Sequence, residues 1–161
     1  MFIIDFDDTL FDTRVGYSRM RISALKKIGV SEEIYKESYL KAREEKGVVA
    51  YNHQRHAEIL ASYGFDKKQI FFVLEKFVKK EILKKFLFVD SIYFLKKIKK
   101  LGQKIILLSS GEKKFQKNKF NMLGIEKYFD EIIIVPNEKK KILTKLLKNI
   151  KDKKNWFIND K

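Results

Sequence analysis

The sequence predicts an α/β fold in which a parallel sheet core is interrupted by an inserted all-helical domain. In the second half of the chain, short apolar runs without strict alternation are separated by amphipathic helical segments, which is typical of a parallel sheet covered on both faces. Another apolar run, at residues 2–6, is separated from these by the helical pattern of residues 12–86. We expect a Rossmann-like core made of residues 1–11 and 88–161, with the helical insert over residues 12–87.

The first strand is expected at residues 2–6, where the apolar run is too short for a helix. Four helices are expected in the insert, over residues 12–29, 31–47, 50–64 and 66–86. Ser31 is suited to cap the second of them, and Asp66 with Gln69 forms a capping box for the fourth. We expect no clear strand within residues 12–86.

The remaining elements alternate between helix and strand. We expect helices at residues 90–102, 112–124 and 137–150, and strands at residues 104–111, 131–136 and 155–160. Because the strands are short and apolar throughout, they should be buried between helices and should run parallel. The carboxyl ends of these strands then meet at one edge, which is where open α/β sheets bind ligands.

Composition limits the function classes. The chain has 161 residues, 45% of them hydrophobic, and no cysteine, so a folded core is expected and disulfides and thiolate metal sites are excluded. No window approaches the length of an apolar membrane span, and the N-terminus lacks the basic leader and long apolar run of a secretory signal. A cytoplasmic protein is therefore expected.

The net charge of +15 raises the question of a nucleic-acid partner. Most of the 36 basic residues are lysines, and they are spread along the chain at spacings that place them on solvated helix faces. We therefore do not expect nucleic acid to be the partner. The charge still attracts anionic small molecules over long range.

Against this basic background, the densest acidic cluster directly follows the first strand. Asp5, Asp7 and Asp8 lie within four residues, and Thr9 comes next. Like charges this close repel one another unless a cation compensates them. Polar groups suited to the same chemistry follow the other strands: Ser109 and Ser110, Asn159 and Asp160, and the lysines at 139–141. Carboxylates, a hydroxyl and an ammonium at one edge can hold Mg²⁺ and a phosphoryl group.

In this arrangement the chain resembles the haloacid dehalogenase superfamily, specifically a phosphohydrolase with a helical (C1-type) cap. "DFDDTLFDT" is similar to the family's first motif, Asp-x-Asp-x-Thr, and "IILLSSG" resembles its second, an apolar strand that ends in Ser or Thr. The resemblance covers residues 1–14 and 88–161, and the insert matches in position, length and class. The family supplies another carboxylate a few residues beyond Asp160 and then more structure, so we expect the chain to be truncated at its C-terminus.

The resemblance implies roles that the chemistry of these groups also supports. Asp5 would attack phosphorus and form an aspartyl-phosphate, and Asp7 would act as general acid and then as general base. Mg²⁺ would be held by Asp5, the backbone carbonyl of Asp7, and Asp160. Ser109 would donate a hydrogen bond to a phosphoryl oxygen, and Lys139 would neutralise charge on the phosphoryl group.

Several assignments have alternatives. Ser109 is favoured over Ser110 because it falls where the family's strand ends, while Ser110 also suits a helix N-cap or a substrate contact. Lys139 is favoured because Ile142, Leu143 and Leu146 follow it at helical spacing, while Lys140 and Lys141 remain open.

Other polar residues near the first motif and in the insert also have candidate roles. Arg14 is the arginine nearest to the first motif, and we expect it to contact a substrate anion. Asp8 and Thr9 are expected to bond locally within their turn. His53 and His56 are interpreted as polar groups on the surface of an amphipathic helix, and the alternative, which the resemblance implies, is that they contact the leaving group of the substrate.

The sequence thus predicts a Mg²⁺-dependent phosphomonoester hydrolase that acts on a small phosphorylated metabolite, such as a nucleotide, a sugar phosphate or a phosphoglycolate-like compound. A phosphomutase of the same family is the alternative within the class. From a different class, the alternative is a basic nucleic-acid-binding module or an inactive fragment that retains the fold. The sequence does not indicate an oligomeric state.

Overall fold

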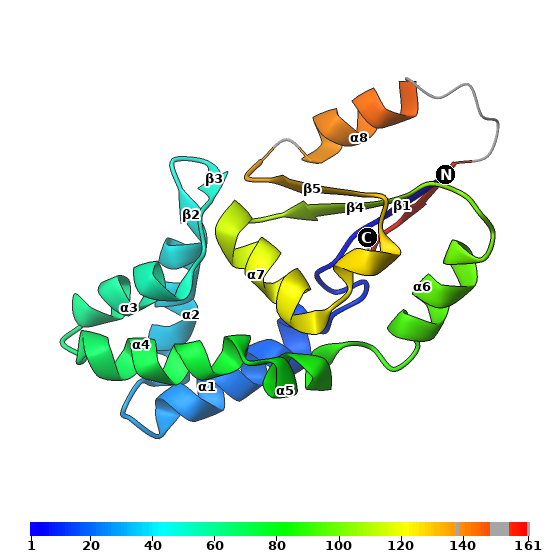
Figure 1. The fold of residues 1–161 in the computed structure, drawn as a ribbon. Coiled ribbons are helices and arrows are strands. Elements are labelled where there is room, and N and C mark those ends of the chain that lie inside the picture. Colours follow the sequence, from blue (N-terminus) through cyan, green and yellow to red (C-terminus); the bar gives the residue numbers. More distant parts are fainter. Residues whose placement is uncertain (138, 149–154, 161) are drawn as a thin grey trace.

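The protein's computed structural model describes residues 1–137, 139–148 and 155–160. Four strands form one parallel sheet in the order β5-β4-β1-β6 (Figure 1). Their bounds are Phe2–Ile4 for β1, Ile105–Ser110 for β4, Glu131–Val135 for β5 and Trp156–Ile158 for β6. The predicted α/β class with a Rossmann-like parallel core is confirmed.

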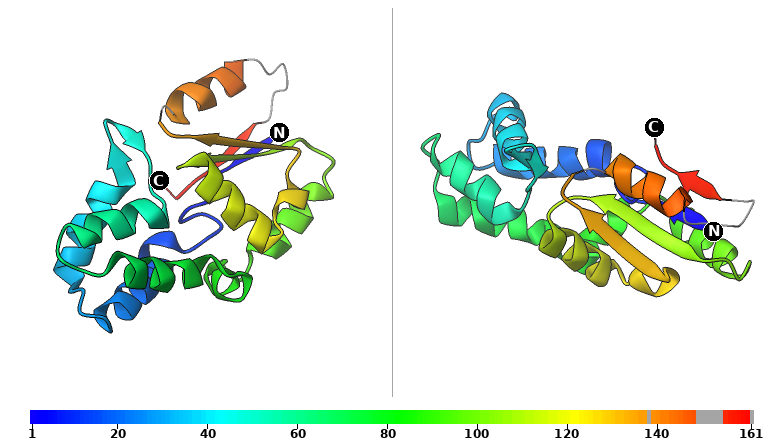
Figure 2. Two further views of the ribbon diagram at one scale, coloured as in Figure 1. Left: turned by 60° about the vertical axis from the view of Figure 1, so that its left-hand side comes forward. Right: turned by 90° about the horizontal axis from the view of Figure 1, so that it is seen from above.

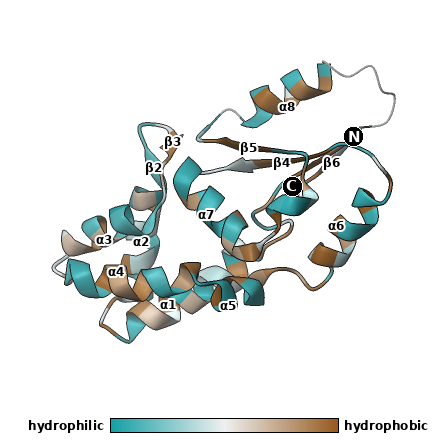
Figure 3. Ribbon diagram, in the orientation of Figure 1, coloured by the Kyte–Doolittle hydropathy of each residue, from teal (hydrophilic) through white to brown (hydrophobic). Residues whose placement is uncertain are grey.

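Helices cover both faces of this sheet (Figure 2). On one face, α8 (Lys139–Lys148) packs through three apolar side chains against strand residues, namely Ile142, Leu143 and Leu146. On the other face, α6 (Ser91–Lys99) and α7 (Lys113–Leu123) bury apolar residues against Ile4, Ile105 and Leu107. Burial on both faces explains why β1 and β4 are apolar at nearly every position, and Figure 3 shows the strands of the sheet as hydrophobic ribbons.

The register of the sheet brings the strand ends together. Phe2 of β1 pairs with Ile105 of β4 on one side and with Trp156 of β6 on the other. Because all three strands run in the same direction, the residues that follow them meet at one edge of the sheet. That edge carries Asp5, Ser110 and Asn159.

The insert is mainly helical. It contains a π-helical turn at Thr13–Tyr17, then α1 (Ser18–Lys26), α2 (Glu32–Arg43), α3 (His53–Ala61), α4 (Lys67–Glu75) and α5 (Lys80–Leu83), with 3-10 turns at Lys76–Val78 and Lys84–Phe86. A last 3-10 turn, Glu126–Tyr128, belongs to the second half of the chain. The helices of the insert share an apolar cluster of their own, which includes Leu25, Leu60 and Leu74. The division into residues 1–11 with 88–161 and 12–87 stays a prediction.

Two predicted helix starts have the expected capping bonds. Ser31 Oγ accepts a hydrogen bond from the Ile34 amide at 3.2 Å, and Asp66 Oδ1 accepts one from the Gln69 amide at 2.6 Å. Each side chain satisfies an amide at the first turn that has no partner within the helix.

The prediction that residues 12–86 contain no strand is wrong. The expected helix over residues 31–47 ends at Arg43, and an antiparallel hairpin follows, with β2 at Glu44–Glu45 and β3 at Val48–Val49. Lys46 and Gly47 both have positive φ, 50° and 78°, which is the backbone that a two-residue hairpin turn requires. Gly47 therefore forms a turn rather than a helix end.

The hairpin also connects the insert to the sheet. The Val49 amide donates to the Pro136 carbonyl at 2.8 Å, at the end of β5. This bond holds β3 beside the carboxyl edge of the sheet.

Within the described part of the chain, no helix is both long and apolar enough to cross a membrane.

Candidate active site

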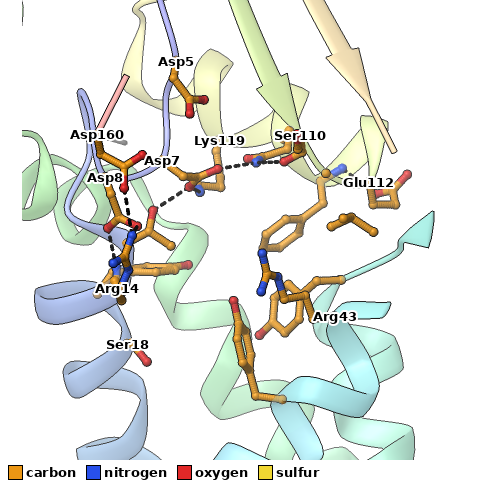
Figure 4. Close-up of a pocket in the computed structure, with 18 of the residues that line it drawn as sticks. Asp5, Asp7, Asp8, Arg14, Ser18, Arg43, Ser110, Glu112, Lys119 and Asp160 are labelled. Atoms are coloured by element: carbon orange, nitrogen blue, oxygen red, sulfur yellow. Dashed lines mark hydrogen bonds and ion pairs between the residues drawn. The ribbon is translucent and has the colours of Figure 1, made fainter. Parts of the chain in front are cut away.

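A cavity of about 600 Å³ lies between the carboxyl edge of the sheet and the insert (Figure 4). Its sheet side is lined by polar and charged residues that include Asp5, Asp7, Asp8, Ser110, Lys139 and Asp160. Its insert side is lined by aromatic and basic residues that include Tyr17, Arg21, Tyr39, Arg43 and Tyr51. The cavity therefore brings together groups from both halves of the fold.

Asp5 is held at the end of β1. Its amide donates to the Ile158 carbonyl of β6 at 3.0 Å, and its Oδ1 accepts from the Phe6 amide at 2.7 Å. Its Oδ2 lies 2.5 Å from Lys139 Nζ. Burial raises the pKa of Asp5, and the ion pair with Lys139 opposes this only in part. Asp5 is thus a buried, positioned carboxylate with one cationic neighbour.

Lys139 is the member of the lysine run that lines the cavity. It is the first residue of α8, whose apolar residues three, four and seven positions later pack on the sheet. This packing turns the Lys139 side chain toward Asp5, while Lys140 and Lys141 are exposed. The helical spacing that favoured Lys139 in the sequence is the physical reason for its position.

Asp7 has three side-chain partners. Its Oδ1 accepts from Thr13 Oγ1 at 2.5 Å and from Lys119 Nζ at 3.1 Å, and its Oδ2 accepts from Gln116 Nε2 at 2.7 Å. Burial by itself would raise the pKa of Asp7, but the Lys119 ammonium and these hydrogen bonds hold it below its ordinary value. Asp7 is therefore ionised in this arrangement.

Lys119 is nearly completely buried, with 3% of its side chain exposed. Its ammonium lies 4.8 Å and 4.7 Å from the ring centroids of Phe6 and Phe11. Burial lowers the pKa of Lys119, although the Asp7 carboxylate opposes the shift. The aromatic rings and the carboxylate together stabilise a cation that would be costly to bury alone.

The sequence analysis missed Lys119 and Gln116, although it contains a signal for both. Gln116, Lys119, Phe120 and Leu123 occupy the buried face of α7 at the i, i+3, i+4, i+7 spacing of an apolar stripe. A lysine and a glutamine at positions where apolar residues are expected indicate buried polar partners. Those partners are Asp7 for both side chains, and also Ser109 for Gln116.

The two serines at the end of β4 have different surroundings. Ser109 is fully buried, and Gln116 Nε2 lies 3.3 Å from its Oγ. Ser110 lines the cavity, and its carbonyl accepts from Gln116 Nε2 at 3.1 Å. Ser109 therefore faces a protein partner in this structure, and Ser110 is the serine that adjoins the cavity.

Arg14 joins two acidic residues at the edge of the cavity. Its Nη2 lies 2.8 Å from Asp160 Oδ2 and 3.2 Å from Asp8 Oδ2, and its amide donates to Asp8 Oδ1 at 2.8 Å. Asp8 has a φ of 61°, in the left-handed region, as a turn residue often does. The expected local bonding of Asp8 is thus observed. Thr9 differs, because its Oγ1 is buried without a hydrogen-bond partner among the described residues.

The predicted metal ligands were Asp5, Asp160 and the backbone carbonyl of Asp7. In the described residues, no group of three or more His, Cys, Asp or Glu side chains is placed to hold a metal ion. Asp5 and Asp160 nevertheless both line the cavity, with an ammonium and a guanidinium as their present partners. Two carboxylates and a carbonyl are hard oxygen donors, and this donor set fits Mg²⁺ with water completing the shell.

The interpretation of the two histidines as surface groups is wrong. His53 and His56 are 2% and 0% exposed. His56 Nε2 lies 3.0 Å from Ser38 Oγ, and its Nδ1 lies 3.2 Å from the Tyr51 hydroxyl. These hydrogen bonds satisfy the two nitrogens of the buried His56 ring, which the sequence pattern had indicated to be at the surface. Burial lowers the pKa of both histidines, and that of His56 falls to about 3.

The fold and the cavity define the class of protein: an α/β protein with a Rossmann-like parallel sheet, two aspartates at the carboxyl edge of that sheet, and a mainly helical insert beside them. A family model described as haloacid dehalogenase-like hydrolase matches residues 1–155. The chain therefore belongs to the haloacid dehalogenase-like hydrolases. A comparison with curated proteins finds no match.

Solved structures match nearly the whole chain at low identity. A putative haloacid dehalogenase-like hydrolase from Burkholderia xenovorans is 18% identical, with a TM-score of 0.69, over 99% of this chain and 71% of that one. A putative β-phosphoglucomutase from Thermotoga maritima is 18% identical, with a TM-score of 0.61, over 97% and 74%. The putative HAD-hydrolase YfnB from Bacillus subtilis, described as bound to magnesium, is 14% identical, with a TM-score of 0.58, over 97% and 77%. Dehalogenases are also among the matched structures, and at these identities the likeness shows the fold.

Proposed function

We propose that this hydrolase is a Mg²⁺-dependent phosphatase that acts on a small phosphorylated metabolite. The observation that carries the proposal is the pair Asp5 and Asp7, which are two residues apart, line one cavity, and have separate cationic partners. One carboxylate is then available as nucleophile and the other as proton donor and acceptor. The cavity of about 600 Å³ is of a size that suits a small molecule.

In the first step, an Asp5 oxygen attacks phosphorus as the bond from phosphorus to the leaving oxygen breaks. The product is an aspartyl-phosphate, and Asp7 gives a proton to the leaving oxygen. In the second step, Asp7 takes a proton from a water molecule, which attacks phosphorus and displaces Asp5. Inorganic phosphate and the free Asp5 carboxylate result. Lys139 neutralises negative charge on the phosphoryl group, and Ser110 or Ser109 donates a hydrogen bond to it.

The surroundings of Asp7 suit the second step directly, because the ionised form stabilised by Lys119 is the form that accepts a proton. For the first step Asp7 must carry a proton. A bound phosphate adds negative charge near Asp7, which raises its pKa and favours the protonated form. The first step thus requires protonated Asp7 and the second requires ionised Asp7. Binding of the phosphoryl group near Asp7 favours the protonated form, and its transfer to Asp5 restores the ionised form.

Mg²⁺ would be held by Asp5, Asp160 and the backbone carbonyl of Asp7. When bound, it neutralises charge on the phosphoryl oxygens. Asp5 and Asp160 have Lys139 and Arg14 as their present ionic partners, and their remaining lone pairs would be available to the metal. Arg14 lines the same cavity, and we propose that it contacts a substrate anion.

The chemistry of the leaving group favours phosphate esters over organic halides. An alkoxide is a strong base and leaves readily only when protonated, which requires an acid such as Asp7. A halide ion is a weak base and leaves without a proton. A carboxylic acid beside the nucleophile is therefore needed for the departure of an alkoxide and not for the departure of a halide. We also propose that the enzyme works in the cytoplasm and that nucleic acid is not its partner.

The test is a hydrolysis screen with and without Mg²⁺. Release of inorganic phosphate is measured for nucleoside monophosphates, sugar phosphates and phosphorylated hydroxy acids, and release of chloride is measured for 2-chloropropionate. Mg²⁺-dependent phosphate release that is lost in Asp5→Asn supports the proposal. Chloride release without phosphate release overturns it in favour of a dehalogenase, and transfer of the phosphoryl group to a second sugar phosphate overturns it in favour of a phosphomutase.

A further inference from the structure

The insert side of the cavity contains a buried cation that the proposed reaction does not use. Arg21, on α1, is 2% exposed and lines the cavity. Four tyrosine rings surround its guanidinium carbon, at centroid distances of 4.5 Å for Tyr17, 5.2 Å for Tyr51, 5.4 Å for Tyr39 and 5.9 Å for Tyr35. We call these residues the tyrosine cage.

The guanidinium is under-satisfied within the cage. One of its five donors, on Nη1, bonds to the Tyr51 hydroxyl at 2.6 Å, and its buried Nε has no partner among the described residues. No carboxylate in the described part of the chain forms an ion pair with Arg21. Arginine stays protonated, so the Arg21 charge is buried. Without an anionic partner, only the faces of the aromatic rings stabilise this charge.

The tyrosines do not provide that anion. Burial raises the pKa of Tyr17, of Tyr35 and of Tyr51, so their hydroxyls stay neutral. Their rings offer cation–π attraction, which partly offsets the desolvation of the guanidinium without neutralising its charge.

The acidic residues that line the cavity are already engaged. Asp5 pairs with Lys139, Asp7 pairs with Lys119, and Asp8 and Asp160 share Arg14. Glu112 caps α7 by accepting from the amides of Lys114 and Phe115. A second arginine on the insert side, Arg43, is exposed at the cavity, as Figure 4 shows.

The two ends of the cavity are close enough for one small ligand. The Tyr17 ring contacts both cations: its centroid lies 4.5 Å from Arg21 Cζ and 5.7 Å from Lys119 Nζ. The separation of the two cations cannot exceed the sum of these distances. A chain of a few carbon atoms therefore spans from a phosphoryl group beside Asp5 and Asp7 to the guanidinium.

We propose that Arg21 binds a second anionic group of the substrate, a carboxylate or a second phosphate, so that the preferred substrates are small phosphomonoesters with two anionic ends. This inference rests on the phosphatase function proposed above and specifies its substrate class. The tyrosine cage holds the guanidinium rigidly in place, and the apolar rings strengthen its attraction for an anion by excluding water.

The test compares matched substrates. Propyl phosphate, 3-phosphonooxypropanoate and 1,3-propanediol bisphosphate share a three-carbon chain and differ in the group at the far end. We expect the carboxylate or the bisphosphate to have a kcat/KM at least about tenfold above that of propyl phosphate, mainly through KM, because a charge-assisted bond to Arg21 forms only with them. Whichever of these two substrates has the larger increase in kcat/KM over propyl phosphate shows whether Arg21 binds a carboxylate or a second phosphate.

Variants assign the preference to Arg21. Arg21→Met should bring kcat/KM for the two substrates with an anionic far end down to that for propyl phosphate in the same variant, and Arg21→Lys should retain part of the preference. Arg19→Met is the matched control, since Arg19 is an exposed residue on the same helix. Equal kcat/KM for all three substrates in the wild-type protein overturns the proposal even if Arg21→Met fails to fold.

A binding measurement separates this inference from the proposed function. The phosphonates 4-phosphonobutanoate and butylphosphonate mimic the first two substrates and are not hydrolysed at the C–P bond. Calorimetric titration should show tighter binding of the carboxylate-bearing phosphonate, lost in Arg21→Met. Equal binding of the two overturns the role of Arg21, whereas preferential binding without hydrolysis of any phosphate ester overturns only the phosphatase function.

Discussion

Lys119 Nζ lies 3.1 Å from Asp7 Oδ1, and the two side chains are unequally buried, with 3% of the lysine and 27% of the aspartate exposed. Water can therefore still reach the carboxylate, while the ammonium depends on the protein for its partners. The pair connects α7 to the loop after β1 and positions a proposed catalytic carboxylate.

The unequal burial predicts an unequal loss of stability. Asp7→Asn leaves a fully buried ammonium without its counterion, and we expect a loss of about 3 kcal/mol in the free energy of unfolding. Lys119→Met places an apolar chain of similar volume among Phe6, Phe11 and Tyr17, and Asp7 keeps its bonds to Thr13 and Gln116. We expect a loss of about 1 kcal/mol. Urea unfolding at pH 7 measures both.

The double variant Asp7→Asn with Lys119→Met is the control for this interpretation. Because it removes both charges, it should be more stable than Asp7→Asn alone. If the two single variants lose equal stability and the double variant loses their sum, the two charges are not coupled, and the prediction is wrong.

The proposed nucleophile and acid–base residue should respond differently to amide substitution. Asp5→Asn should abolish turnover, because an amide is not a competent nucleophile at phosphorus. Asp7→Asn should lower turnover and lead to accumulation of the aspartyl-phosphate, because no base activates water in the second step. Acid-quench trapping of labelled phosphate on the protein distinguishes the two. Near wild-type turnover in Asp5→Asn would show that another group attacks.

The parallel sheet could be predicted from the sequence because its strands are short, apolar and bounded by helix caps, so local pattern and tertiary burial agree. The hairpin at residues 44–49 could not, because its first strand consists of two glutamates that continue a helical pattern. What ends the helix is a turn with positive φ at Lys46 and Gly47 and a bond from Val49 to Pro136, which is distant in sequence.

The residues of the candidate site also fall into two groups, those that could be predicted from the sequence and those that could not. The positions of Asp5, Asp7 and Lys139 at the cavity were predictable because each lies within three residues of a strand end or begins a helix, and the carboxyl edge of the sheet collects such residues. Arg21 and Lys119 were not, because a charged side chain on a helix is usually solvated, and burial of these two depends on partners in other elements. A polar residue within an apolar stripe was the available signal for Lys119.

Among the three lysines at the start of α8, Lys139 alone should matter for catalysis. Lys139→Met removes the ammonium beside Asp5, and we expect kcat to fall by about a hundredfold or more, as for loss of a charge that stabilises a phosphoryl transition state. Lys140→Met is the matched control, because Lys140 is exposed one residue away, and it should retain kcat within about twofold. Steady-state phosphate release measures both, and equal losses would refute the assignment to Lys139.

The buried imidazole of His56 should make the fold sensitive to acid. Burial and the nearby Arg21 charge lower the pKa of His56 to about 3 in the folded protein, whereas a histidine in the unfolded chain titrates near its ordinary value of about 6.5. Between these two values the unfolded chain binds a proton that the folded protein does not bind. The free energy of unfolding should therefore fall as the pH drops below about 6.5, by up to about 1.4 kcal/mol for each pH unit from this group.

Urea unfolding at pH 7.5, 6 and 5 measures this slope, and the matched variant is His56→Gln, whose amide can still bond to Ser38 or Tyr51. Burial also lowers the pKa of His53, so the variant should keep a smaller slope in the same direction. Asp5 has a raised pKa and opposes the trend, but it does so equally in both proteins, so the difference between their slopes isolates His56. Slopes that are the same in the variant and the wild-type protein would show that His56 takes up its proton without unfolding.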